Sequence, residues 1–263
     1  GRTTADEPSP TTRSGGQNTR SILTDAGYTS EKVLANPDTA SRIDKLRYTY
    51  SDDELKQLFA KGRDQKKGIG TILETLEGRS FQNKLIEQIG EKSYIQLSNN
   101  QVTTLRSFNE NDTIFSLLKT MKDGKIEGKI PFDDYIAIRR KSVHNEASGT
   151  LTLGKYEAVI VNGKKTPGPS SYNTISSNNG TTYFDLGSDW KKIETQYGID
   201  DSKMFEYFNI PVLDNAIQSK KLIVFTHNPE VDAGALRKEF NYIMKTGVYA
   251  YDKKSMIAIY IGE

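Results

Sequence analysis

Hydrophobic positions follow two different spacings along the chain, and the change occurs near residue 148. Upstream, apolar residues recur three and four positions apart, which is the period of one face of a helix. Downstream, short apolar runs alternate with polar residues or lie between turn signals, as is typical of strands. The pattern therefore predicts an α+β protein, with an N-terminal helical region followed by a compact α+β domain that has a mostly antiparallel sheet.

The helical region carries start signals as well as apolar stripes. Ser51 is placed to cap a helix that has acids in its first turn, and Leu55, Leu58 and Phe59 recur along it at helical spacing. Pro131 is placed in the first turn of a further helix. Similar stripes occur in SFQNKLIEQIG and NDTIFSLLKTMKDG.

Strand signals dominate after Gly149. Leu151 and Leu153 alternate with threonines, YEAVIV is rich in residues that favour strands, and Asn162-Gly163 marks a turn. We expect a buried strand in KLIVFTH and a terminal hairpin in VYAYDKKSMIAIYIG. We also expect Pro211 to interrupt a helix, because proline lacks a backbone donor and disfavours helix in the residue before it.

The same change of pattern sets the expected organisation of the chain. Residues 1–20 hold almost no large apolar side chain and are rich in Thr, Ser, Gly and Pro, so they are expected to form a disordered linker. A helical domain is expected over residues 21–147 and an α+β domain over residues 148–263. No apolar run approaches the roughly 18 residues that a membrane span requires, so no stable span is expected.

Charge and composition limit the chemistry that the chain can carry. Lys and Arg number 36 against 34 Asp and Glu, and residues 148–263 hold thirteen of each sign. A basic face for nucleic acid, which draws much of its affinity from phosphate neutralisation, would therefore have to arise by clustering. The chain has no cysteine, which excludes disulfides, thiolate metal sites and a Cys nucleophile.

Four segments between about residues 180 and 250 form a series. The first is an aromatic-Asp-Leu-Gly strand, Tyr183 to Gly187, and the second is a helix with an Asn, Asn209, and a Leu-Asp-x-Ala-Ile core, Leu213 to Ile217. The third is a strand ending in His before Pro, His227 to Pro229, and the fourth is a Glu-aromatic helix before Gly, Glu239 to Gly247. This series resembles the C-terminal toxin modules of bacterial polymorphic toxins, of the contact-dependent-inhibition and Rhs type.

The resemblance implies an antibacterial effector that is secreted, or delivered by a carrier polypeptide, and acts in the cytoplasm of a target cell. It implies enzymatic attack there, most often cleavage of RNA or DNA, and a cognate immunity protein as partner. It also implies that the helical domain upstream serves delivery. The VENN motif that borders many contact-dependent toxins does not occur in this chain.

A candidate catalytic set follows if the activity is a metal-free RNase, the favoured reaction. Such an enzyme needs a general base, a general acid and a cation, and the candidates are His227, Glu239 and Arg237. His227 is expected at the end of a strand, where it could instead cap a turn together with Thr226 and Asn228. Arg237 and Glu239 are two residues apart and do not share a helix face.

Five residues are candidates for substrate binding. Arg139, Arg140 and His144 would form a phosphate-contacting patch if they lie on one helix, or only a solvated basic helix end. Tyr183 and Trp190 lie in a polar region rich in aromatics, where they could stack on a base or a nicotinamide ring, or could simply pack in the core.

Two other functions fit the same residues. The neutral charge of residues 148–263 suits attack on NAD, by glycohydrolysis or ADP-ribosyl transfer, better than it suits nucleic-acid cleavage. A non-catalytic binding module would instead offer its C-terminal hairpin, Val248 to Ile261, to a partner strand. No metal motif occurs, and no metal or cofactor is expected.

Overall fold

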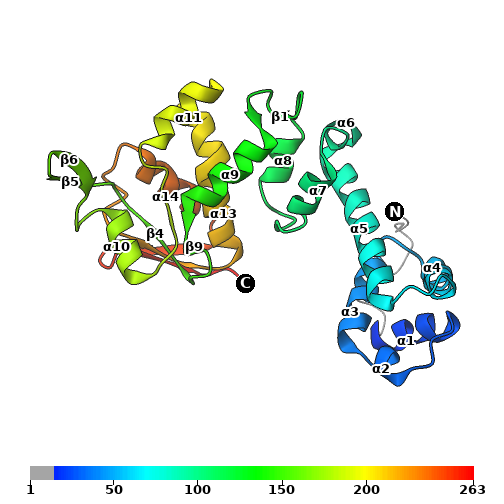
Figure 1. Ribbon diagram of the computed structural model, residues 1–263. Coiled ribbons are helices and arrows are strands. Elements are labelled where there is room, and N and C mark those ends of the chain that lie inside the picture. The colour runs from blue at the N-terminus through cyan, green and yellow to red at the C-terminus, as the bar shows by residue number, and fades with distance from the viewer. Residues whose placement is uncertain (1–14) are drawn as a thin grey trace. The chain divides into compact units, whose positions relative to one another are not determined.

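The computed structural model describes residues 15–263, with residues 15–18 described by their backbone alone (Figure 1). The chain divides into two compact units, Gly1–Tyr94 and Ile95–Glu263. The first unit is helical where it is described, and the second is α+β with a mostly antiparallel main sheet, so the predicted fold class is confirmed. Within residues 15–263, no helix has both the length and the apolar character that crossing a membrane requires.

The first unit consists of helices, two of which begin at a side-chain N-cap, Asn36 and Ser51. Ser51 accepts a hydrogen bond from the Glu54 N–H, and the Glu54 side chain accepts one from the Ser51 N–H, so this predicted cap is confirmed. The helices are α1 (Gly15–Asp25), α2 (Glu31–Leu34), α3 (Pro37–Leu46), α4 (Asp52–Asp64), α5 (Ile69–Ile89) and α6 (Glu91–Tyr94).

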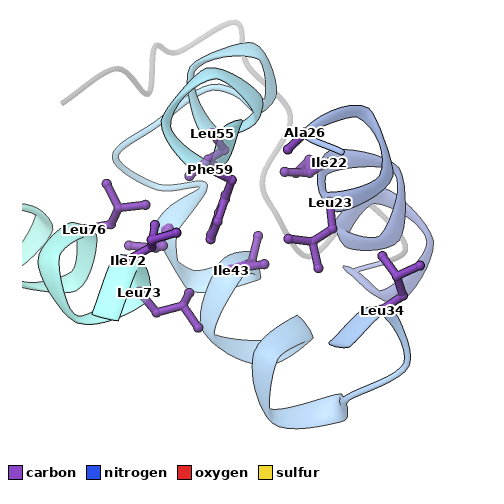
Figure 2. Packing of buried hydrophobic residues seen from close by; sticks show 11 residues of the cluster. Ile22, Leu23, Ala26, Leu34, Ile43, Leu55, Phe59, Ile72, Leu73 and Leu76 are labelled. Carbon is purple, nitrogen blue, oxygen red and sulfur yellow. The ribbon is translucent and has the colours of Figure 1, made fainter. Parts of the chain in front are cut away.

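One hydrophobic cluster holds α1 to α5 together (Figure 2). Phe59 and Leu55 of α4 are fully buried, and Ile43 of α3 is buried with them. Gly62 lets α4 and α5 approach closely, since a β-carbon there would lie 2.5 Å from Cδ1 of Ile72. The cluster consists of Ile22, Leu23, Ala26, Leu34, Ile43, Leu46, Leu55, Phe59, Ile72, Leu73 and Leu76.

The second unit begins with short helices and continues into the sheet. Its helices are α7 (Asn99–Leu105), α8 (Ile114–Leu118), α9 (Phe132–Ser142), α10 (Tyr172–Asn179), α11 (Asp189–Tyr197), α12 (Asp201–Met204), α13 (Ile210–Gln218) and α14 (Ala235–Lys245), with a π-helical segment at Phe205–Asn209. Its strands are β1 (Lys125–Ile126), β2 (Ile130–Pro131), β3 (Val143–His144), β4 (Thr150–Leu153), β5 (Ala158–Val161), β6 (Lys164–Pro167), β7 (Tyr183–Phe184), β8 (Leu222–Phe225), β9 (Tyr249–Asp252) and β10 (Ile257–Tyr260).

The main sheet has the strand order β4-β8-β10-β9. Strands β4 and β8 are parallel, whereas β10 pairs antiparallel with both β8 and β9. Alternate residues of β8, Ile223 and Phe225, are buried in the core. Strands β5 and β6 form a separate hairpin whose turn contains Asn162 and Gly163, both with positive φ, and Figure 1 shows it projecting from the unit.

Pro211 does not end the helix in which it lies, contrary to expectation. The chain stays helical from α12 through the π-helical segment into α13, and Pro211 falls in the first turn of α13. Proline has no N–H for the carbonyl four residues earlier, which is that of Tyr207. That carbonyl instead accepts a hydrogen bond from the Tyr135 hydroxyl at 2.7 Å, so it has a donor although Pro211 provides none.

The boundaries differ from those expected from the pattern. Of the predicted linker, residues 1–14 lie outside the described residues, while residues 15–20 belong to α1. The compact units meet at residue 94 rather than at residue 147. Residues 95–147 belong to the second unit because their contacts are with it: Glu127 pairs with Lys203 at 3.0 Å, Asp134 accepts from the Tyr197 hydroxyl, and β3 pairs with β7.

Candidate active site

A cavity of about 850 Å³ opens in the second unit where β4 ends. Its wall comes from segments far apart in the sequence: the residues after β4, strand β6, the start of α10, the loop after β7, and the first turns of α14. Asn209, the last residue of the π-helical segment, also lines it. The volume is that of a site for a small molecule of nucleotide size.

One part of the cavity wall is aromatic. Tyr172, Phe184 and Trp190 all line the cavity, with Leu236 beside them. The Tyr172 hydroxyl donates to the Phe184 carbonyl, and the Trp190 indole N–H donates to Asp201 at 3.2 Å, which fixes both rings. Such a wall can stack against a planar heterocycle.

Glu239 supplies a neutral carboxylic acid to the cavity. It lies on α14 and is buried, with 8% of its surface exposed. Burial raises the pKa of its carboxyl group to about 8; a hydrogen bond with the Asn209 side chain opposes this rise, and the negative charge of Asp232 adds to it. Glu239 is therefore mostly protonated at neutral pH.

Asp232, also in the cavity wall, has a pKa that is shifted in the opposite direction. Burial acts to raise its pKa, but the backbone N–H groups of Gly234 and Arg237 and the ammonium of Lys155 outweigh burial, so the pKa lies below its ordinary value. The two N–H groups donate to Oδ2 at 2.9 and 3.3 Å, and Lys155 Nζ lies 3.4 Å from Oδ1. The cavity thus pairs a protonated acid with an ionised one, an arrangement found where acids and carboxylates have separate chemical roles.

Asp185 is a third carboxyl group in the wall, and its two oxygens are held separately. The Gly187 N–H donates to Oδ1 at 2.8 Å, and the Asn173 amide donates to Oδ2 at 3.0 Å. Asn173 is itself buried and accepts a hydrogen bond from the Ser171 hydroxyl at 2.6 Å. Asp185 is therefore fixed in orientation at the cavity.

His227, a predicted catalytic residue, lies outside the lining of this cavity. Its Nδ1 accepts a hydrogen bond from the Lys155 N–H at 3.1 Å, which places the ring proton on Nε2. Nε2 then donates to Glu157 at 2.6 Å. Both ring nitrogens are engaged within the protein, and the ring ties the end of β8 to the segment after β4.

The structure does not bring the three predicted catalytic residues together at one site. Arg237 donates from its guanidinium to the backbone carbonyl of Glu230 and does not line the cavity, whereas Glu239 does. Of the set His227, Arg237 and Glu239, Glu239 alone faces the cavity.

The predicted phosphate patch is divided among different surroundings. Arg139 is held in a two-bond ion pair with Asp112, at 2.8 and 3.0 Å, and packs against the Phe108 ring. Arg140 is exposed. Both line a second cavity of about 230 Å³, away from Glu239. His144 lies in β3 after α9 has ended, so the helical spacing expected between Arg140 and His144 does not exist.

The two predicted aromatic residues, Trp190 and Tyr183, differ in their position relative to the cavity. Trp190 lines the 850 Å³ cavity and is half-buried. Tyr183 stacks on His144, with ring centres 4.6 Å apart, and meets Tyr172 edge to face. Tyr183 therefore supports a cavity residue rather than lining the cavity.

Sequence reasoning did not select Asn209, Asp232 or Lys155 for chemistry. Asp185 was not selected for a role in catalysis or binding either. Two of these residues did carry a signal, because Asp185 and Asn209 both stand within the segments that resemble toxin modules. Asp232 has no such signal, since only folding brings its loop to the end of β4.

Across residues 15–263, no group of three or more His, Asp or Glu side chains is placed to hold a metal ion. No family model, curated protein or solved structure matches the chain.

Proposed function

We propose that the chain is an effector enzyme that cleaves the N-glycosidic bond between nicotinamide and ribose in NAD. One observation carries the proposal: the cavity combines an aromatic wall with two acids, Glu239 and Asp232, whose pKa values are moved in opposite directions. Its volume suits a nucleotide better than a polymer groove.

The reaction fits the groups that line the cavity. The bond from C1′ to the nicotinamide nitrogen breaks, and its electron pair leaves with nicotinamide, which becomes neutral. C1′ acquires oxocarbenium character, which a fixed carboxylate stabilises, and we assign this role to Asp232. Water then bonds to C1′, and we assign Asp185 the acceptance of its proton, which passes to solvent.

The same geometry gives less support to RNA cleavage. A metal-free RNase needs its base, acid and cation around one phosphate. His227 has both nitrogens occupied, and Arg237 is bonded to a backbone carbonyl, so neither is free at the cavity. We therefore rank NAD cleavage first.

The biological setting rests on the resemblance to polymorphic toxins. We propose that a carrier polypeptide delivers the chain to a target cell, where it acts in the cytoplasm, and that a cognate immunity protein blocks it. NAD loss would kill such a cell without any contact with its nucleic acids.

The test measures NAD and nucleic acids side by side. The purified full chain is incubated with NAD, and in parallel with RNA and with DNA, and products are separated by chromatography and by gels. We expect nicotinamide and ADP-ribose in equal amounts and intact nucleic acids. Asp232→Asn should lower the rate at least 100-fold while retaining the acceptor for the N–H groups of Gly234 and Arg237.

Asp123→Asn is the matched control, because Asp123 is exposed and its positive φ suits Asn. Its rate should equal that of the wild type. RNA cleavage with unchanged NAD would contradict the proposal and restore the nuclease hypothesis.

A further inference from the structure

Asn209 carries a buried polar atom that has no hydrogen-bond partner. Only 4% of the residue is exposed, and its Oδ1 accepts no hydrogen bond from any residue in the described chain. The residue lines the 850 Å³ cavity. Buried acceptors are nearly always satisfied in folded proteins, so an unpaired one in the wall of a cavity marks a place where a donor in the cavity can bind.

The backbone around Asn209 is also specialised. Asn209 ends the π-helical segment Phe205–Asn209, and such turns within a helix occur frequently at functional sites. The Tyr135 hydroxyl bonds the Tyr207 carbonyl, for which Pro211 has no N–H, and the chain continues beyond Asn209 as helix α13. The amide of Asn209 is therefore displayed from a rigid element rather than from a loop.

Glu239 completes the recognition group. Its carboxyl group is hydrogen-bonded to the Asn209 side chain, whose Nδ2 is the donor toward it. A neutral carboxylic acid also has one O–H to donate. Side by side, the pair then offers the cavity one acceptor, Asn209 Oδ1, and one donor, the Glu239 hydroxyl.

We propose that Asn209 and Glu239 recognise a planar amide of the ligand, with the ligand N–H donating to Asn209 Oδ1 and the ligand C=O accepting from Glu239. The inference rests on the proposed function, for which the amide is the carboxamide of nicotinamide. The lactam edge of a nucleobase, such as that of uracil, has the same chemistry. A ligand with a carboxylate instead of the amide would lack the N–H, and it would bring a negative charge next to Asn209 Oδ1 and the Glu239 carboxyl group.

Binding of small probes to the full chain tests the inference without requiring turnover. Trp190 is the single tryptophan and lines the cavity, so its fluorescence reports occupancy, and calorimetry gives the affinity. At pH 6.5 we expect nicotinamide to bind at least tenfold more tightly than nicotinic acid. 3-Acetylpyridine, which keeps the carbonyl and lacks the N–H, should also bind more weakly than nicotinamide.

Variants assign the effect to the pair. Asn209→Leu should weaken nicotinamide binding at least tenfold, because leucine has no acceptor for the ligand N–H. Glu239→Gln retains a donor and should bind within about threefold of the wild type, whereas Glu239→Leu should not bind. Asn215→Leu is the control, because Asn215 is exposed on the adjacent helix α13 and lies outside this cavity.

The outcomes separate the inference from the reaction. Equal binding of nicotinamide and nicotinic acid, or full binding by a folded Asn209→Leu protein, would overturn amide recognition even if NAD is cleaved. Selective nicotinamide binding without NAD cleavage would support amide recognition and contradict the proposed reaction. Tighter binding of uracil than of nicotinamide would support amide recognition, and it would indicate that the substrate contains a nucleobase in this place rather than nicotinamide.

Discussion

The Tyr135 hydroxyl donates a 2.7 Å hydrogen bond to the backbone carbonyl of Tyr207, 72 residues later in the chain. Both residues are fully buried. This bond replaces the helical donor that Pro211 cannot provide, and it joins α9 to the π-helical segment that displays Asn209. A buried contact remote from the cavity thus supports the cavity wall.

Tyr135→Phe should therefore destabilise the second unit. The change leaves the Tyr207 carbonyl buried without a donor, which costs about 1–3 kcal/mol in the free energy of unfolding. Urea denaturation followed by Trp190 fluorescence measures the loss. Tyr197→Phe is the control, because the Tyr197 hydroxyl donates to the half-buried carboxylate of Asp134, which water can solvate after the change. An equal loss in both variants would contradict the role given to Tyr135.

The ion pair between Arg139 and Asp112 should contribute to stability rather than to substrate binding. Side chains of both residues are largely buried, at 16% and 12% exposure. Arg139→Met should cost about 3–5 kcal/mol in the free energy of unfolding, because it leaves the Asp112 charge unpaired. Adding Asp112→Asn should recover part of this loss while keeping the acceptor that binds the Ile114 N–H.

Activity assays on the same variants separate the two roles of Arg139. A folded Arg139→Met protein should cleave NAD at the wild-type rate. Normal stability combined with loss of activity would instead support the phosphate-binding role that the sequence suggested.

The fold class and two residues of the cavity, Glu239 and Trp190, were readable from the sequence, whereas the rest of the site was not, and the residues show why. Ser51 and the Asn162-Gly163 turn act through their near neighbours, so their spacing is sufficient to predict them. The prediction that Pro211 interrupts a helix was wrong, because Tyr135 compensates for the missing donor and no local sequence pattern encodes that contact. The cavity draws Lys155, Asp232 and Asn209 from separate segments, and only the tertiary structure brings them together.

His227→Ala should leave NAD cleavage within about threefold of the wild type. The ring holds the Lys155 N–H and the Glu157 carboxylate, and both partners lie near solvent, so we expect a loss of only ~1 kcal/mol in stability. Rates at saturating and at low NAD, together with the urea midpoint, measure the two effects. A rate loss of 100-fold or more in a stably folded His227→Ala protein would make His227 catalytic after all.

Glu239 should make the stability of the second unit fall as pH rises. Burial raises its folded-state pKa to about 8 from an ordinary value of 4.5, so the folded state binds the proton more tightly than the unfolded state does. The stabilisation is complete below pH 4.5 and is lost as pH rises through 8. Its total size is on the order of several kcal/mol, since each pH unit of this interval corresponds to about 1.4 kcal/mol.

The neighbours of Glu239 do not share this titration. The low pKa of Asp232 keeps it ionised between pH 5 and 8.5, and the raised pKa of Tyr172 keeps that phenol neutral. Glu239→Gln is neutral at every pH and should remove most of the slope. Urea denaturation at pH 5, 6.5 and 8, read by Trp190 fluorescence, measures the free energy of unfolding. The value for the variant, relative to that of the wild type, should therefore increase as pH rises. Parallel pH profiles for the two proteins would show that Glu239 is ionised in the folded state, and the donor assigned to it would then be absent.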